Sequence, residues 1–308
     1  MRKFLPFLFA AALASSCIDN AYDLSNVNTD DVTIGDEDSE YRLPLATVYV
    51  SMSELNEGGA DIKTLFDEAD IWLPSPLPGN AAYVELRDLQ NTPETITPLL
   101  DALIDQMMDD DAKITAVADL LAEKYLSTFL PLLPPNTDPA DFKPVFIEAF
   151  RNMPMLHDRL SGEVKSLAGS YLTELKVQDV TYDIGKIDIG GDVVDMLCEN
   201  LDSEGTPNPK NTLHLYGSIT SALPVSLRLV PYFSPTNVRF DVTVEPGITN
   251  EIRETQLFES DLRQIIGGAE IILPVLLEKY YPGYDFTSDQ QIIITLRLIK
   301  RGGLKLNL

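Results

Sequence analysis

The chain has few of the residue types that usually carry catalysis or bind metals. Its 308 residues include two histidines, two cysteines and one tryptophan. His157 and His214 lie far apart, and neither has a cysteine or histidine neighbour at the spacing of metal ligands. The nucleophile elbow, the phosphate-binding loop and the dinucleotide-binding fingerprint are all missing from the sequence. These absences argue against an enzyme, and the sequence predicts no catalytic residue, no metal ligand and no cofactor.

Positive charge is scarce as well. Lys and Arg number 23 against 48 Asp and Glu, which gives a formal net charge of −25. The phosphates of nucleic acids and anionic lipid headgroups repel such a chain. We therefore expect no nucleic-acid partner, and we interpret the charge as a means of staying soluble and dispersed at a crowded surface.

Apolar runs long enough to cross a membrane are missing after residue 16. The first residues follow another pattern: Arg2 and Lys3 precede the apolar run 4–13, and the small residues 14–16 lead to Cys17. The order of basic, apolar and small residues is typical of a secretory signal peptide. Because the run is too short to span a bilayer, a cleavable signal peptide over residues 1–16 is predicted.

The residues around the expected cleavage site resemble the lipobox of bacterial lipoproteins; they read Leu13-Ala14-Ser15-Ser16-Cys17. Ala14 takes the place where that family usually has leucine. The resemblance implies that Cys17 is lipidated on its sulfur and holds the mature chain on a lipid bilayer. Stable anchoring needs two or more acyl chains, such as palmitate, and a lipobox cysteine carries at least two. Cys198 is then the one remaining thiol, so no internal disulfide is expected, and its apolar neighbours predict that it is buried.

The segment after Cys17 is strongly acidic. Residues 18–40 contain eight Asp and Glu side chains and no Lys or Arg. Such a segment buries little apolar surface and repels itself. Residues 17–40 are therefore predicted to form a flexible, extended tether between the membrane and the folded body.

The rest of the chain changes its hydrophobic period twice. Between residues 92 and 175, apolar residues repeat every three or four positions, which predicts four amphipathic helices. On either side they alternate with polar residues, as in antiparallel sheets that have one buried face. The expected fold class is α+β, with an antiparallel β-sandwich-like body over 41–91 and 176–308 and a four-helix insertion over 92–175.

Local signals refine this prediction at three places. Thr97 before Pro98 predicts an N-cap followed by the first helical residue. The segment 71–73 around Trp72 is expected to be a short packed strand. Pro274 indicates that the single strand expected over 269–281 lies at a sheet edge, because proline cannot donate to a ladder.

The C-terminal residues reverse the sign of the charge, since Arg297, Lys300, Arg301 and Lys305 oppose only Asp289. Two interpretations remain open. The favoured one is an edge strand that lysine and arginine protect from aggregation. The other is a docking strand for an acidic partner or for the chain's own acidic tether.

Two acidic stretches resemble metal sites only superficially. Gly205 is sixth in a stretch with oxygen-bearing side chains at Asn200, Asp202, Glu204 and Asn208, as in a calcium loop. Asn211 stands where that loop needs a bidentate glutamate, so a surface turn is the better interpretation. The run 109–111, three aspartates, is interpreted as a helix boundary.

The start of the expected mature chain carries a further resemblance. Residues 17–24 read Cys-x-Asp-x-x-Tyr-Asp-Leu, and Leu43-Pro44-Leu45 follows in the first strand. These motifs resemble the start of uncharacterised lipoproteins of the Bacteroidetes, and the strand-rich C-terminal third resembles them loosely. The resemblance implies a lipid-anchored protein of the outer membrane, either surface-exposed or facing the periplasm, and it assigns no catalytic residue.

Three functional hypotheses follow from the sequence. The leading one is a non-enzymatic binding or structural module of the cell envelope, with a protein or glycan partner. The second is a carrier of a lipid or another apolar ligand, held between helices and sheet by residues such as Met107, Phe146 and Phe150. The third is a hydrolase that uses two facing carboxylates across a cleft, for which the single Trp72 offers little stacking surface.

Overall fold

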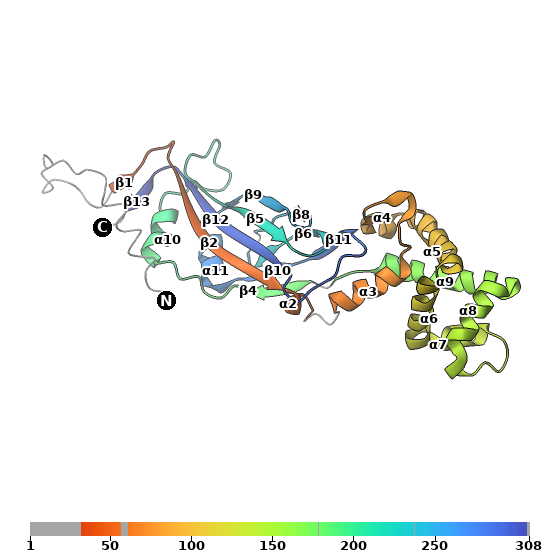
Figure 1. Cartoon of the computed structure of the whole chain (residues 1–308). Helices are drawn as coiled ribbons and strands as arrows, with labels where there is room; N and C mark the ends of the chain where they lie inside the picture. The colour runs from red at the N-terminus through yellow and green to blue at the C-terminus, as the bar shows by residue number, and fades with distance from the viewer. Residues whose placement is uncertain (1–31, 57–60, 178, 237, 307–308) are drawn as a thin grey trace, which may run out of the picture.

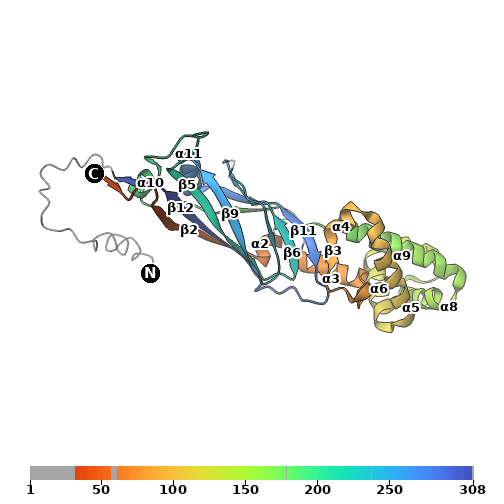
Figure 2. The same cartoon turned by 90° about the horizontal axis from the view of Figure 1, so that it is seen from above.

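The computed structural model describes residues 32–56, 61–177, 179–236 and 238–306. It is an elongated molecule, with a β-rich body and a group of helices at one end (Figures 1 and 2). Every pair of named strands is antiparallel, and no helix in the described ranges is long and apolar enough to span a membrane. The predicted α+β class is confirmed.

The described strands form four sheets. The longest has the order β2-β12-β5-β9, the second β3-β11-β6-β8, the third β4-β10-β7, and a two-stranded sheet pairs β1 with β13. Their bounds are β1 Val32–Ile34, β2 Glu40–Ser51, β3 Val84–Glu85, β4 Val180–Asp183, β5 Thr212–Ser221, β6 Val225–Leu229, β7 Tyr232–Ser234, β8 Val242–Val244, β9 Thr249–Leu257, β10 Glu270–Leu273, β11 Val275–Tyr280, β12 Gln291–Arg301 and β13 Leu304–Leu306.

The prediction for Pro274 was wrong. The chain forms two strands there, β10 and β11, and each is central in its sheet. Pro274 lies between them, where the chain leaves one sheet and enters the next. Because the missing N–H falls in this gap, no ladder loses a donor, which is why proline is tolerated between two central strands.

Four of the described helices occur where the period of the apolar residues predicted helices. The four expected helices are α5 Thr97–Asp109, α6 Asp111–Lys124, α8 Phe142–Asn152 and α9 Pro154–Glu174. The other described helices are α2 Met52–Asn56, α3 Ile62–Trp72, η3 Pro78–Asn80, α4 Leu86–Asn91, η4 Pro93–Ile96, α7 Leu126–Phe129, η5 Leu130–Leu132, η6 Pro139–Asp141, α10 Gly191–Cys198 and α11 Glu259–Gly268.

Of two predicted helix starts, the structure contradicts one and confirms the other. Thr97 is not an N-cap, because η4 runs directly into α5 and leaves Ile96 in the cap position without a side-chain bond. Asp110 does cap the next helix, since its Oδ1 accepts hydrogen bonds from the backbone N–H groups of Ala112 (2.8 Å) and Lys113 (3.3 Å). The aspartate run is therefore a helix boundary, as predicted.

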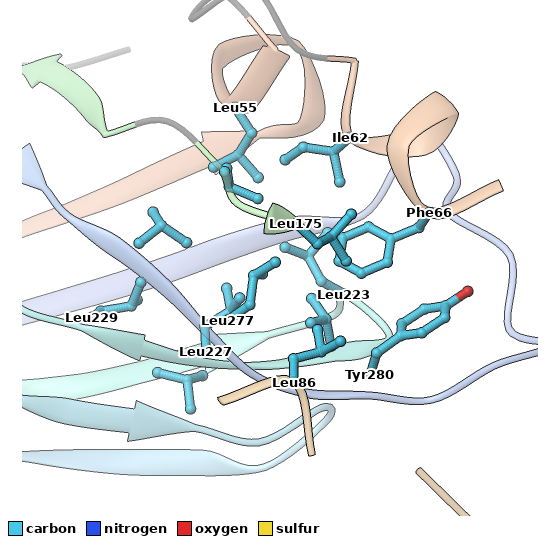
Figure 3. Packing of buried hydrophobic residues seen from close by; sticks show 14 of the residues in the cluster. Leu55, Ile62, Phe66, Leu86, Leu175, Leu223, Leu227, Leu229, Leu277 and Tyr280 are labelled. Carbon is cyan, nitrogen blue, oxygen red and sulfur yellow. The ribbon is translucent and has the colours of Figure 1, made fainter. Parts of the chain in front are cut away.

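Helix α3 connects the body to the helices, and it corrects the strand predicted at 71–73. Ile71 and Trp72 are its last two residues. Figure 3 shows Ile62 and Phe66 of α3 directed toward Leu223, Leu227, Leu277 and Tyr280 of the β body. Trp72 at the other end is fully buried, and its ring centroid lies 6.2 Å from that of Tyr125 beside α6. The run 71–73 is apolar because it enters a helical core, a case that periodicity cannot separate from a buried strand.

The acidic segment is folded over its last part. Residues 17–31 of the predicted tether lie outside the described residues, but Val32–Ile34 form β1, which pairs with β13 from Val32↔Leu306 to Ile34↔Leu304. Glu40 opens β2. The favoured interpretation of the basic C-terminus as an edge strand was wrong, because β12 lies between β2 and β5. The alternative, docking of the chain's own acidic segment, agrees with this pairing and with the ion pair between Arg301 and Glu40.

Gly217 provides a test of the central sheet. A Cβ at this position in β5 would lie 1.9 Å from the carbonyl oxygen of Thr295 in β12. We expect Gly217→Ala to lower the free energy of unfolding by about 3 kcal/mol, because the added methyl group would push against the backbone of β12, which is held in the sheet by its hydrogen bonds. Gly162→Ala is the matched control: it lies inside α9 with open space around it and should raise the free energy of unfolding by about 0.5–1 kcal/mol. Urea denaturation measures both, and equal stabilities of the two variants would contradict the close approach.

Candidate functional site

The structure places the two histidines in separate structural settings. His157 lies in α9, where its Nδ1 is 2.7 Å from the carbonyl oxygen of Phe150 and its Nε2 is 3.3 Å from Ser161 Oγ. His214 lies in β5, with Nε2 3.0 Å from Thr212 Oγ1. Burial, and then the nearby Arg301, lower the pKa of His214. Each ring is held by its own local contacts, and the structure does not bring the two together.

Cys17, the expected lipidation site, lies outside the described residues. The other cysteine, Cys198, is buried at the end of α10, as predicted. Burial raises the pKa of its thiol to about 11, so it is protonated at neutral pH and is a poor nucleophile.

The stretch 200–211, which resembles a calcium loop in sequence, forms a turn whose two ends are joined by hydrogen bonds. The Asp202 carboxylate accepts hydrogen bonds from the backbone N–H groups of Lys210 (2.7 Å) and Asn211 (2.8 Å). Both bonds are accepted by Oδ2, and they lower the pKa of Asp202. Across the described parts of the chain, no group of three or more His, Cys, Asp or Glu residues is arranged to hold a metal ion.

The residues expected to line an apolar cavity are instead packed against other side chains. Met107, Phe146 and Phe150 are fully buried, and the Phe146 ring lies about 6 Å from those of Phe129, Phe142 and Phe150. At the contact between α3 and the sheet, a void of about 10 Å³ remains. A single water needs about that much space, so this contact has no room for an apolar ligand. Its walls belong to the cluster in Figure 3.

An open groove lies where the β body meets the helices. We call it the tyrosine groove; its volume is about 310 Å³ and it is lined by Pro224, Glu245, Pro246, Ile248, Tyr281 and Tyr284. Tyr281 and Tyr284 follow β11, whereas Glu245, Pro246 and Ile248 come from the turn between β8 and β9. Ile248 is 55% exposed and Tyr284 is 65% exposed, an unusual state for large apolar side chains that lie together.

A hydrogen-bonded set of side chains holds one wall of the tyrosine groove. Glu245 Oε1 accepts a hydrogen bond from Lys279 Nζ, and Glu245 Oε2 accepts one from the Tyr281 hydroxyl, each at 3.0 Å. Burial acts to raise the pKa of Glu245, but the hydrogen bonds from Lys279 and Tyr281, together with the positive charge of Lys279, act to lower it, and the net pKa is lowered. Lys279 Nζ also lies 5.0 Å from the centre of the Tyr83 ring. Tyr281 and Glu245 are therefore fixed before any ligand arrives, which lowers the entropic cost of binding.

A second hollow adjoins the tyrosine groove. It has a volume of about 190 Å³ and is lined by Leu77, Pro78, Ala81, Tyr83, Val84, Glu85, Asp88, Leu89, Thr95, Pro98 and Leu99. Tyr83 links the two hollows, because its ring centroid is 5.5 Å from that of Tyr281. The two hollows together make a track across the junction between sheet and helices.

Sequence reasoning missed the tyrosine groove. Its parts come from segments near residues 224, 246 and 283, which only the strand order brings together. One local signal was available: residues 280–284 read Tyr-Tyr-Pro-Gly-Tyr, a dense aromatic run in a turn. Aromatic side chains in an exposed turn are more typical of a binding surface than of a core.

Comparisons with known proteins yield one distant structural similarity. No protein-family model matches the chain, and no curated protein sequence is similar to it. The similar structure is a candidate secreted protein from Parabacteroides distasonis, 18% identical, with a TM-score of 0.30. The aligned part covers 41% of this chain and 38% of that chain, so the similarity is too distant to define a common fold or function.

Lys300, one of the basic C-terminal residues, yields a test of pH dependence. It is fully buried in β12, where Nζ donates hydrogen bonds to the carbonyl oxygens of Arg301 (2.8 Å) and Gly303 (3.4 Å). Burial lowers its pKa from 10.5 to about 8. Between these values the unfolded chain binds more protons than the folded chain, so this lysine makes the free energy of unfolding rise with pH.

We expect Lys300→Met to remove that rise. The free energy of unfolding of the variant, minus that of the parent, should fall by on the order of 3 kcal/mol as the pH increases through this window. Urea denaturation across the window measures the difference. The exposed Lys176→Met variant is the control, and its curve should run parallel to the parent curve. A parallel curve for Lys300→Met would contradict the shifted pKa.

Proposed function

We propose that the protein is a lipid-anchored, non-enzymatic binding module of the bacterial cell envelope, with the tyrosine groove as its ligand site. The observation that carries this proposal is the exposure of Ile248 and Tyr284 beside a Tyr281 that is held in place by Glu245. Exposed apolar side chains that gather in a hollow mark interaction sites, and tyrosine is enriched where partners bind most strongly. The groove combines such a surface with a few fixed polar atoms, as ligand sites do.

The shape of the molecule supports anchoring through the N-terminal segment. The β1–β13 pair, whose first strand lies within the acidic segment, is at the end of the body opposite the helices (Figures 1 and 2). A chain held by lipid on Cys17 would therefore present the junction and the helices away from the bilayer. Lipidation of Cys17 and a place in the outer membrane are parts of the proposal, since they rest on the lipobox resemblance.

The two alternative functions have less support. A carrier needs an enclosed apolar space, whereas the contact between α3 and the sheet leaves about 10 Å³. A hydrolase with two carboxylates needs an ionisable pair free to act across a cleft. The carboxylate of the tyrosine groove, Glu245, is already bound by Lys279 and Tyr281. A binding function requires exposed apolar side chains and a few fixed polar atoms, and the tyrosine groove has both.

Anchoring is tested by Cys17→Ala in the full chain. The expected result is that the parent protein fractionates with membranes and gains the mass of a lipid, whereas the variant is released without that mass, because it lacks the thiol that the lipid would modify. Membrane fractionation and mass spectrometry of the intact protein measure this. Cys198→Ala is the control and should remain anchored. Equal fractionation of the Cys17 variant and the parent would refute anchoring through Cys17.

Ligand binding at the tyrosine groove is tested by site-specific photo-crosslinking in cells that make the full chain. A photoreactive phenylalanine at position 284 should capture a partner, and the additional Tyr281→Ala substitution should abolish that capture, because it removes the fixed wall of the groove. The matched control is the same reagent at position 49, where Tyr49 of β2 is 53% exposed but does not line the groove. Equal capture at both positions, or capture that survives Tyr281→Ala, would count against the groove.

A further inference from the structure

We infer that the ligand of the tyrosine groove is an extended polypeptide segment with basic and apolar side chains, which continues past Tyr83 into the second hollow. This inference rests on the proposed function and names the chemical class of the ligand. Three features of the described residues support it: the continuity of the track, its charge, and its shortage of hydrogen-bonding groups.

The track is continuous through a pair of rings. Tyr281 lines the tyrosine groove, Tyr83 lines the second hollow, and their ring centroids are 5.5 Å apart. Tyr83 is 36% exposed, so the pair offers an aromatic surface between the two hollows. A ligand that fills both hollows must be long and extended to pass over this surface, which excludes a compact small molecule as the occupant of the whole track.

The charge along the track is negative after its internal ion pairs are counted. The tyrosine groove contributes one carboxylate, Glu245, which is paired with Lys279 beside the groove at 3.0 Å. Glu85 and Asp88 in the second hollow add two carboxylates, so the residues that line the two hollows include three acidic side chains and no lysine or arginine. The chain as a whole carries a formal charge of −25. Lysine or arginine on the ligand would be attracted to this wall, and an acidic ligand would be repelled.

The shortage of hydrogen-bonding groups favours a peptide over a saccharide. Among the six residues that line the tyrosine groove, the polar side chains are Glu245, Tyr281 and Tyr284, and the first two already bind each other. A saccharide would bury many hydroxyls against Pro224, Pro246 and Ile248 without partners, and each unmet group is costly. Apolar side chains and proline rings of an extended peptide suit such a surface, because aromatic grooves bind extended proline-containing segments.

The probe for the test is a labelled peptide of four Lys-Leu-Pro repeats, and fluorescence anisotropy measures its binding to the mature chain carrying Cys17→Ala. We expect saturable binding that a Tyr281→Ala, Tyr284→Ala double variant weakens by roughly tenfold or more, because these rings form the contact surface. Because this double variant leaves the net charge of the chain unchanged, weaker binding would show that the tyrosine groove holds the probe, rather than the acidic surface as a whole. A peptide of four Glu-Leu-Pro repeats should not bind.

Charge variants separate the track from the acidic surface. Glu85→Gln with Asp88→Asn should weaken binding of the lysine probe, and the effect should shrink as salt is added, because the attraction is screened. The matched control removes two exposed carboxylates from the helices, Asp105→Asn with Asp158→Asn, and should leave binding within about twofold. Equal losses for both pairs would overturn the inference, since the probe would then respond to net charge alone.

A neutral saccharide, cellohexaose, is tested in the same assay by competition. Binding of cellohexaose in place of the peptide would overturn the peptide class while leaving the tyrosine groove as a ligand site. Failure of both probes to bind would also overturn the inference. The proposed function is tested separately, by photo-crosslinking: capture at position 284 that survives Tyr281→Ala would contradict it. The failure of the proposed function can therefore be distinguished from the failure of the peptide class.

Discussion

The arrangement of the molecule depends on one helix that belongs to two hydrophobic cores. The N-terminal half of α3 buries Phe66 against Tyr280 and Phe286 of the β body, with ring centroids 4.6 and 4.8 Å away. Its C-terminal half buries Trp72 among the helices. A helix is stiff over this length, so the two cores cannot rotate against each other without exposing apolar surface at one end. The tyrosine groove and the second hollow lie across this junction, and α3 therefore fixes the geometry of the candidate site.

Buried polar groups hold α3 in place on the helical side. Glu68 accepts hydrogen bonds from Lys124 and from the Tyr125 hydroxyl, at 2.5 and 2.9 Å, and the Trp72 indole lies 3.4 Å from its carboxylate. Lys113 donates to the carbonyl oxygens of Asp70 and Leu73, which end α3 without helical partners. Each buried charge thus has partners, and removal of either group would leave unmet polar atoms in the core. Because hydrogen bonds are directional and apolar contacts are not, these contacts favour one orientation of α3 against the helices.

The sequence predicted what depends on neighbouring residues and missed what depends on distant ones. The period of apolar residues located α5, α6, α8 and α9, because helical faces repeat locally. Pro274 and the basic residues of β12 were wrongly assigned to edges, because strand order is set by contacts between residues far apart in the chain. The tyrosine groove was missed for the same reason, since Tyr284 and Ile248 become neighbours only through the pairing of the sheets. Trp72 shows the remaining ambiguity, a short apolar run that suits either a strand or a helix end.

The position of β2 has a mechanical consequence. The chain passes from β1 through a short turn into β2, which pairs with β12 from Glu40 to Ser51 along the body toward α2 and α3. A pulling force that arrives through the N-terminal segment and is resisted at the helical end would act along the axis of β2. In that direction the force acts on all hydrogen bonds between β2 and β12 at once, rather than on one after another. The two strands would therefore separate only if many of these bonds broke together. Tension applied between the two ends of the molecule would therefore load the β2–β12 ladder in shear.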